Sequence, residues 1–376
     1  MSGTGRQRPF AVIAGGGTGG HVTPALAIGG ALVAAGHQRD SILFVGSRRG
    51  MERDMVPAAG FPVELLPGRG LVRRASRDNL GAAAGLAVAT ARAVILLRRR
   101  RPAVLVSVGG YAAAPAAVAA VLWRVPIVLA EANAVPGAVH KLLARFARAS
   151  AVSFPDTPLP RAVVTGNPIR EQMQHVDRSP RGRQAAREAL GYPASAFLVA
   201  AGGGSLGAGR INEVVLGVVD AWRERSDVAI HHIVGARNAA DLAGRRPELP
   251  AGIVYRQVPF EERMDLVYAA ADVAVHRSGA STVAELAAAG LPSVLIPLPR
   301  SPGDHQTRNA RSMAAAGGAV VVADDDLDAD RLAAELDDLR AHPERLSAMG
   351  DGARTLAVPD AAHRVAALVE EQARRG

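Results

Sequence analysis

The chain has 376 residues, of which 49% are hydrophobic and 21% charged, and its formal net charge is +9. This length exceeds what one ordinary hydrophobic core organises, so two globular domains are expected. The lack of cysteine excludes a disulfide framework, thiol catalysis and thiolate metal sites. The positive charge predicts anionic partners such as nucleic acid, phospholipid or phosphorylated substrates.

The sequence shows neither a targeting segment nor a membrane-spanning one. The N-terminal segment MSGTGRQRPF has no long apolar region, and no apolar run reaches the roughly 18 residues that span a bilayer. We therefore expect an intracellular protein.

The first half alternates short apolar segments with alanine-rich helical segments, of which 23–35 and 80–99 are the clearest. This alternation predicts parallel βαβ units. The proline-rich segment 153–170 then interrupts the pattern and is the expected passage between domains. The predicted strands of this half are 10–14, 41–45, 104–108, 127–130 and 151–153.

The second half repeats the alternation, beginning again with a strand, a glycine loop and a helix. Ligands of open α/β sheets bind at the carboxyl ends of the strands. We therefore predict an α/β protein with two doubly wound, Rossmann-like domains facing each other across a cleft. The predicted strands of this half are 197–201, 229–234, 253–257, 273–276, 294–297 and 319–322.

Three glycine-rich loops follow predicted strands, at 15–20, 107–115 and 202–207. Each precedes a helix, so backbone N–H groups and the positive end of the helix dipole can meet an anion. Three loops in equivalent settings favour a diphosphate ligand. The first loop lacks a clean dinucleotide fingerprint and no Walker pattern occurs, which disfavours a dehydrogenase or a P-loop ATPase.

Several longer segments carry a specific resemblance. In this order they resemble the MurG family of GT-B glycosyltransferases, and the similarity extends to the closing PDAAHRVAALVEE. Members of that family move N-acetylglucosamine from UDP-GlcNAc onto undecaprenyl-diphosphate-linked N-acetylmuramyl-pentapeptide (lipid I), which gives lipid II for peptidoglycan. The segments are GGGTGGHVTPALAI, GGYAAAPAAVAA, AEANAVPG, TGNPIR, GGGSLGAGRIN, HRSGASTVAELAAAGLPSVLIPLP and DHQTRNA.

The resemblance also implies different roles for three parts of the chain. Residues 1–166 would form an acceptor- and membrane-associated domain, and 167–353 would form a UDP-sugar donor domain. Residues 354–376 would form a C-terminal helix that packs back on the first domain. The reaction would invert the anomeric configuration and need no metal and no cofactor, because helix dipoles and backbone donors can meet the charge of the leaving UDP.

The donor site implied by the resemblance lies in RSGASTVAEL. A helix starting near Ala280 would present Ala280, Ser281 and Thr282 to the UDP diphosphate. Glu285 would accept hydrogen bonds from the ribose hydroxyls, since a carboxylate offers two acceptors to a vicinal diol. Its alternative role is that of an acidic residue in the first helical turn that complements the helix dipole. The remaining implied donor residues are Thr18, Gly19, Gly20, Asn133, Arg170, Ser205, Glu261, His305 and Gln306.

The acceptor diphosphate would meet the first two glycine loops, and a base must take the proton of the acceptor hydroxyl. His21 is the first candidate base because an imidazole titrates near neutrality and a helix N-terminus favours its neutral form. Its alternatives are a diphosphate ligand or a polar cap. Glu131 is the second candidate base, with a hydrogen-bonded loop organiser as its alternative. The implied acceptor residues are Gly17, Thr18, Gly109, Gly110 and Tyr111.

Two positions depart from the family pattern. Ala130 stands where a histidine is common, and Leu206 stands where a glutamine is expected. These departures keep two other functions open: a related transferase of secondary metabolism with another acceptor, and a silent lipid-diphosphate-binding module. A UDP-sugar epimerase also stays open, because such enzymes share a two-domain architecture.

Segment 68–102 joins arginine clusters at both ends to an apolar helical middle. Such a stretch can rest on an anionic bilayer, with Leu86, Val94, Ile95 and Leu96 near the lipid. The alternative is a core helix with solvated ends. We therefore expect a peripheral protein at the cytoplasmic face of the membrane. Nucleic acid is not an expected partner, because no basic–aromatic platform or groove-reading motif occurs.

Overall fold

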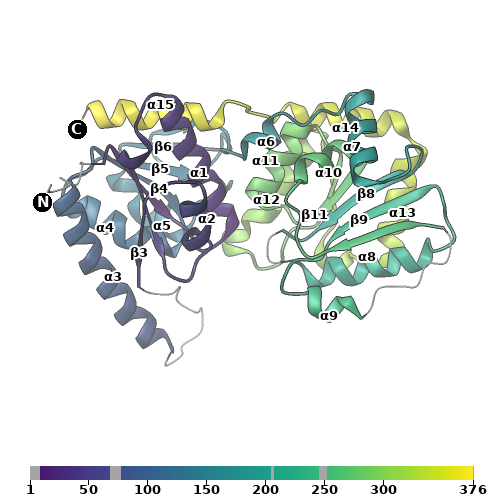
Figure 1. Cartoon of the computed structure of the whole chain (residues 1–376), viewed down its shortest axis with the longest axis horizontal. Coiled ribbons are helices and arrows are strands. Elements are labelled where there is room, and N and C mark those ends of the chain that lie inside the picture. Colours follow the sequence, from purple (N-terminus) through teal and green to yellow (C-terminus); the bar gives the residue numbers. More distant parts are fainter. Residues whose placement is uncertain (1–8, 68–77, 205–206, 245–251, 376) are drawn as a thin grey trace, which may run out of the picture. The chain divides into compact units, whose positions relative to one another are not determined.

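The computed structural model describes residues 9–67, 78–204, 207–244 and 252–375. The chain divides into two compact units (Figure 1). Unit 1 comprises Met1–Arg170 and Asp360–Gly376, and unit 2 comprises Glu171–Pro359. Each unit is built on its own parallel sheet.

Unit 1 contains a seven-stranded sheet in the order β3-β2-β1-β4-β5-β6-β7. Because β1 lies between β2 and β4, the strand order reverses there, and such a switch point is where open α/β sheets bind ligands. The strands are β1 (Ala11–Gly15), β2 (Ile42–Ser47), β3 (Val63–Leu66), β4 (Val104–Gly109), β5 (Ile127–Glu131), β6 (Ala149–Val152) and β7 (Ala162–Val164).

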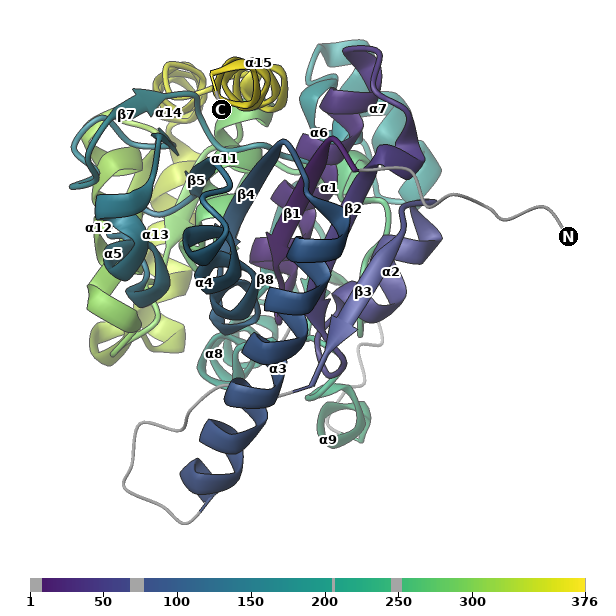
Figure 2. The same ribbon diagram turned by 90° about the vertical axis from the view of Figure 1, so that its left-hand side faces the viewer.

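Both faces of this sheet are covered, as the continuous apolar strands predict. Alternate residues of β1 enter different cores: Ala11 and Ile13 pack with α1, α2 and α15, whereas Val12 and Ala14 pack with α3 and α4. Figure 2 shows α3 beside α4, with α15 on the opposite side of the sheet. The helices are α1 (Gly19–Ala34), α2 (Glu52–Ala58), α3 (Asp78–Arg100), α4 (Ala114–Leu122), α5 (Ala138–Leu143) and α15 (Ala361–Arg374).

Unit 2 contains a six-stranded parallel sheet in the order β10-β9-β8-β11-β12-β13. The reversal of strand order lies between β8 and β11, equivalent to that between β1 and β4. The strands are β8 (Phe197–Gly202), β9 (Val228–Ile233), β10 (Val254–Val258), β11 (Val273–His276), β12 (Ser293–Leu295) and β13 (Ala319–Val321).

The helices of unit 2 alternate with these strands along the chain. They are α6 (Glu171–Gln174), α7 (Pro180–Leu190), α8 (Gly209–Ala221), α9 (Ala239–Ala243), α10 (Met264–Ala270), α11 (Ala280–Ala289), α12 (His305–Ala315), α13 (Ala329–Ala341) and α14 (Pro343–Arg354). The prediction of two doubly wound α/β sheets is therefore confirmed, with strand ends that differ from the predicted ones by one or two residues.

The sequence analysis missed two strands of unit 1, β3 and β7. β7 lies inside the proline-rich segment 153–170 and pairs with β6, so unit 1 continues to Arg170. All three β7 residues are exposed, so the strand lacks the apolar signal of a buried strand. The last helix, α15, begins at Ala361 and packs on α1, β4, β5 and β6. None of the helices described is long and apolar enough to cross a bilayer.

Candidate active site

The first glycine loop connects β1 to α1 at the switch point of unit 1. Gly16 and Gly17 have φ values of +145° and +98°, a backbone region that residues with side chains rarely adopt. Thr18 is the N-cap of α1 but makes no side-chain cap hydrogen bond. The first amides of a helix have no acceptor within the helix, so the start of α1 is suited to an anion.

The carboxylate of Glu52 is buried and contacts this loop. Its Oε2 accepts a hydrogen bond from the amide of Gly17 at 2.8 Å, and its Oε1 accepts one from Ser47 at 2.7 Å. A Cβ at Gly16, Gly46 or Gly50 would lie 2.0–2.3 Å from atoms of the Glu52 side chain, so these glycines make room for it. The amide of Gly17, predicted to bind the acceptor diphosphate, is therefore occupied by Glu52. This geometry does not support Gly17 as a ligand.

The second glycine loop lies against the first. Gly109 and Gly110 have φ values of +86° and +77°, and a Cβ at Gly110 would lie 2.7 Å from the carbonyl oxygen of Gly16. A Cβ at Gly109 would lie 3.5 Å from Nε2 of His21, and Thr18 Oγ1 lies 3.3 Å from His21 Nδ1. The structure thus brings Thr18, His21 and the Gly109–Gly110 turn together, as the sequence predicts.

Tyr111, the third predicted residue of this loop, turns toward β2. Its hydroxyl donates to Ser47 Oγ at 3.0 Å, and a Cβ at Gly17 would lie 3.3 Å from its ring. The side chain therefore supports the first loop from the side, and its hydroxyl is engaged with Ser47.

Glu131 lies at the end of β5 and is almost fully buried. Oε2 lies 2.8 Å from Nδ1 of His140 and accepts from the amide of Gly137 at 2.9 Å. Oε1 accepts from the amide of Asn133 at 3.0 Å and from its side chain at 3.2 Å. Burial opposes ionisation, but the hydrogen bond and charge of His140, with the two amides, lower the pKa of Glu131 to about 2. These contacts match the alternative role of a loop organiser.

The predicted donor residues of α11 and α12 follow strands β11 and β12. Helix α11 starts at Ala280 with Gly279 as N-cap, so Ala280, Ser281 and Thr282 form its first turn. The Ser281 hydroxyl is buried without a hydrogen-bond partner among the residues described. Glu285 lies one turn further along the same helix and is 7% exposed. An anion at this helix start would meet both the helix dipole and an unsatisfied hydroxyl.

Hydrogen bonds tie the start of α12 to the loop before α11. Ser278 Oγ donates to the carbonyl of Gln306 at 2.8 Å, and Asn309 Nδ2 donates to the carbonyl of Ser278 at 3.1 Å. The Gln306 side chain accepts from the amide of Leu298 at 2.9 Å. His305 is anchored through Nδ1, which lies 2.8 Å from the carbonyl oxygen of Pro302. His305 and Gln306 are therefore held near the loop before α11, and their predicted contact with the donor sugar stays a prediction.

Both carboxylate oxygens of Glu261 contact groups within unit 2. Its Oε1 accepts from the amide of Arg263 at 2.8 Å, and its Oε2 lies 3.2 Å from Nε2 of buried His231. The side chain thus points into unit 2 and holds the loop that follows β10. A contact of this loop with the donor stays a prediction.

The remaining predicted residues lie elsewhere. Gly19, Gly20, Asn133 and Arg170 belong to unit 1, and their contacts with a donor stay predictions. Ser205 and Leu206 lie outside the described residues, as do the first ten residues of the predicted membrane segment 68–102. Within the described ranges, no group of three or more His, Asp or Glu side chains gathers as a metal site would require.

Sequence analysis missed two residues of this site, Glu52 and His140. Neither lies in a glycine loop, and both act through contacts with residues distant in sequence. Glu52 contacts Gly17, which is 35 positions away, and His140 contacts Ser107, which is 33 positions away. The cluster of Gly46 and Gly50 around Glu52 was the available signal for a buried side chain there.

The chain matches the models of two protein-family domains: the glycosyltransferase family 28 N-terminal domain over residues 11–152 and the C-terminal domain over residues 198–365. Two curated relatives carry the name UDP-N-acetylglucosamine–N-acetylmuramyl-(pentapeptide) pyrophosphoryl-undecaprenol N-acetylglucosamine transferase. The relative from Desulforudis audaxviator is 36% identical, with 97% of this chain and 99% of the relative covered. The relative from a Nocardioides species is 41% identical, with 96% and 97% covered.

Solved structures agree with this assignment. The crystal structure of Acinetobacter baumannii MurG superposes with a TM-score of 0.74 at 27% identity, covering 97% of this chain and 99% of that one. The kitacinnamycin glycosyltransferase superposes at 0.68 with 19% identity and 98% and 99% coverage, which shows a shared fold alone. Taken with the two family 28 domains and the near-full-length relatives, this similarity shows that the chain belongs to the MurG family of GT-B glycosyltransferases.

Proposed function

We propose that the chain transfers N-acetylglucosamine from UDP-GlcNAc to the MurNAc-pentapeptide of a lipid-diphosphate acceptor, with inversion at the anomeric carbon. The observation that carries this proposal is that relatives named as this N-acetylglucosamine transferase are 36% and 41% identical to the chain over nearly its whole length. The test is a transfer assay with purified chain, UDP-GlcNAc and a short-chain lipid I analogue. We expect a product heavier by one N-acetylhexosamine, and the lack of any transfer under saturating donor would refute the proposal.

The alternative functions have weaker support. Two other glycosyltransferases among the structural neighbours, that of kitacinnamycin and VinC, are 19% and 17% identical to this chain and share the fold alone. The curated relatives named for the cell-wall reaction reach 36–41% over nearly the whole chain. The departure at Ala130 therefore falls within a chain whose remaining sequence supports the lipid-diphosphate acceptor.

In the proposed mechanism His21 removes the proton of the attacking acceptor hydroxyl. Its imidazole stands in the first turn of α1, beside the Gly109–Gly110 turn. The positive end of the helix dipole disfavours an imidazolium there, so the ring is held in the form that accepts a proton. We assign the acceptor diphosphate to the start of α1 and the adjacent glycine turn, with Thr18, Gly109 and Gly110 as ligands and Tyr111 as their support.

The departing UDP is stabilised by the start of α11. The amides of Ala280, Ser281 and Thr282 and the buried Ser281 hydroxyl face the diphosphate, where charge develops as the glycosidic bond breaks. Glu285 binds the ribose hydroxyls. His305 and Gln306 contact the transferred sugar, and Asn133, Arg170 and Ser205 complete the donor set by family resemblance. None of these roles requires a metal ion or cofactor.

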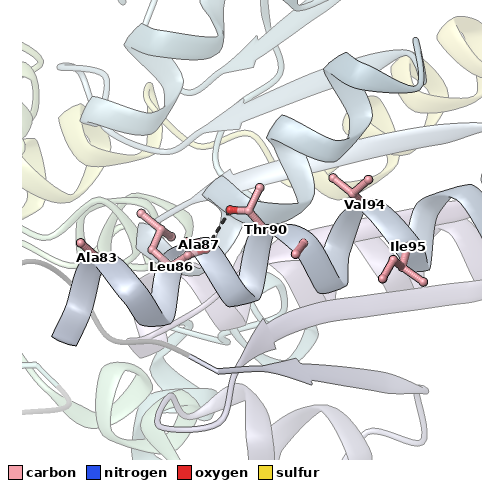
Figure 3. A pocket seen from close by; sticks show the side chains of 7 residues that line it. Ala83, Leu86, Ala87, Thr90, Val94 and Ile95 are labelled. Atoms are coloured by element: carbon pink, nitrogen blue, oxygen red, sulfur yellow. Dashed lines mark hydrogen bonds between the residues drawn. The ribbon is translucent and has the colours of Figure 1, made fainter. Parts of the chain in front are cut away.

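We propose that α3 and α4 form the membrane-facing surface of unit 1. Helix α3 buries Ala89, Ala93 and Leu97 in the core and leaves Val88 and Ile95 about half exposed. A shallow apolar hollow runs along the helix (Figure 3). The Thr90 hydroxyl inside it donates to the carbonyl of Leu86 at 2.8 Å, so it presents no unpaired donor. The residues that line the hollow are Ala83, Leu86, Ala87, Thr90, Ala91, Val94 and Ile95.

Charge and neighbouring side chains support a bilayer as the partner of this surface. Arg98, Arg99 and Arg100 form the last turn of α3, where they can meet anionic headgroups. The Arg98 guanidinium lies 5.5 Å from the ring centroid of Trp123, whose indole N–H donates to the carbonyl of Val94. Leu122 and Trp123 extend the exposed apolar surface onto α4 and the residue after it.

Replacing Ile95 by glutamate is expected to weaken binding to anionic vesicles by about tenfold or more. Because Ile95 is about half exposed, moving the rest of its side chain into lipid contributes about half of the 1.5–3 kcal/mol for full burial, and the added carboxylate repels the headgroups. Vesicle co-sedimentation measures this effect. The matched control is V163E, which adds the same charge at an equally exposed valine of β7. Equal vesicle binding by the two variants would contradict the assignment of this surface.

A further inference from the structure

A buried polar cluster lies directly beneath the glycine turn of the candidate site. It consists of Glu131 at the end of β5, His140 on α5 and Ser107 in β4, which are 5%, 1% and 0% exposed. Polar groups buried this deeply persist only where they are hydrogen-bonded, because each unsatisfied group carries a desolvation cost. The contacts of His140 therefore define what the cluster does.

The hydrogen bonds of His140 fix the position of one of its protons. Nδ1 lies 2.8 Å from Oε2 of the ionised Glu131, so Nδ1 carries a proton and donates it. Nε2 lies 3.1 Å from both the carbonyl oxygen and the hydroxyl of Ser107. Whether Nε2 donates to the carbonyl or accepts from the hydroxyl, the Nδ1–H bond to Glu131 is kept.

The same carboxylate holds the loop that follows β5. Its two oxygens accept from the amides of Asn133 and Gly137 and from the Asn133 side chain. The Glu131 carboxylate therefore fixes both ends of the loop formed by residues 132–136. The direction in which the Asn133 side chain points therefore depends on the orientation of Glu131, which depends on His140.

The imidazole of His140 also supports the glycine turn from below. A Cβ at Gly109 would lie 3.3 Å from Cε1 of His140 and 3.5 Å from Nε2 of His21. Both rings therefore lie close to the side of Gly109 where a Cβ would stand, and the positive φ further favours glycine there. A shift of the His140 ring would change the packing of this turn, which also contacts His21.

We infer that His140 is a positioning residue for the proposed transfer reaction: its Nδ1–H orients Glu131 and Asn133, and its ring supports the turn beside His21. The inference rests on the proposed function and assigns Glu131 as the organiser of the loop instead of a base. Every oxygen of Glu131 already accepts hydrogen bonds, and a carboxylate with so low a pKa is a weak proton acceptor at neutral pH.

The test compares H140N with H140L. An asparagine amide nitrogen can occupy the place of Nδ1 and donate to Glu131, whereas leucine fills the volume without a donor. We expect H140L to lower kcat by roughly 100-fold, the order of loss that a small misplacement of reacting groups causes. H140N should recover most of that loss. UDP affinity should change little in either variant, because the contacts proposed for the UDP diphosphate and ribose, at the start of α11, lie in unit 2.

Three outcomes would overturn the inference: wild-type kcat in H140L, equal losses in H140N and H140L, or a loss in E131Q about 100-fold greater than that in H140L, which would make Glu131 the base. S107A is the comparison variant: it leaves the Nδ1–H bond to Glu131 intact, so its loss of kcat should be much smaller than that of H140L. Should H140L not fold, H140Q takes its place, because its longer side chain carries the amide away from the Nδ1 position.

A structural readout separates this inference from the proposed function. In the wild-type chain, the NMR spectrum should contain a slowly exchanging imidazole N–H resonance from His140 that disappears in E131Q and persists in S107A. A wild-type chain with this resonance but no transfer to a lipid-diphosphate acceptor would refute the function and leave the pair intact. A rapidly exchanging His140 N–H would refute the pair.

Discussion

Replacing His21 by alanine lowers kcat by about 10²- to 10⁴-fold, the range expected for loss of a positioned general base. The reason is geometric: His21 is the titratable side chain that lies against the Gly109–Gly110 turn from the start of α1. UDP affinity should not change, because the helix start that we assign to UDP belongs to the other unit. Steady-state transfer kinetics and UDP titration of the same protein measure both quantities.

The control for H21A is H363A, which removes an imidazole from the exposed side of α15 and should leave kcat unchanged. Kinetic parameters also distinguish the two roles left open for His21. A raised KM for the acceptor with unchanged kcat would make the residue a diphosphate ligand and contradict its role as base. Loss of UDP binding together with activity would indicate a folding defect, which thermal unfolding can identify.

Replacing Glu285 by alanine weakens UDP binding by about 100-fold. Two hydrogen bonds from the ribose to a charged acceptor contribute about 1.5–3 kcal/mol each, and the lower values together give roughly two factors of ten. The carboxylate is well placed for this contribution because it is 7% exposed, one turn from the start of α11. Isothermal titration with UDP measures the loss, and E285Q should lose less because its amide keeps one acceptor oxygen.

A ligand change isolates the ribose contact from other effects of the substitution. Wild-type protein should bind 2′,3′-dideoxy-UDP much more weakly than UDP, whereas E285A should bind both ligands about equally. Such a cycle measures the coupling between the side chain and the hydroxyls. Undiminished discrimination by E285A would contradict the assignment and leave Glu285 as a complement to the helix dipole.

The sequence was sufficient for most of the fold because the sheet strands are short apolar runs buried on both faces. Val104–Gly109 and Phe197–Gly202 are each buried throughout, which their composition predicts. β7 could not be predicted in this way, since its three exposed residues are held in the sheet by backbone pairing with β6. Whether these three residues form a strand depends on the position of β6, and the local sequence pattern does not contain that information.

The candidate site was partly predictable for a related reason. The glycine loops and the start of α11 are contiguous in sequence, so a local motif identifies them. Glu52 instead contacts Gly17, and His140 contacts Glu131, through tertiary structure. A glutamate or a histidine in a helix is common, so residue type alone does not mark either one as part of a site. The structure also shows that Glu261 turns inward to His231, although the resemblance placed it beside the nucleotide.

The central claim is transfer of N-acetylglucosamine to a lipid-diphosphate acceptor without a metal ion. It is tested most directly by incubating purified chain with UDP-GlcNAc and a short-chain lipid I analogue in the presence of EDTA, and by determining product mass and anomeric configuration by NMR. The account predicts one added N-acetylhexosamine in β linkage. An α-linked product, reversible loss of turnover on chelation, or transfer only to acceptors that lack the diphosphate would contradict it.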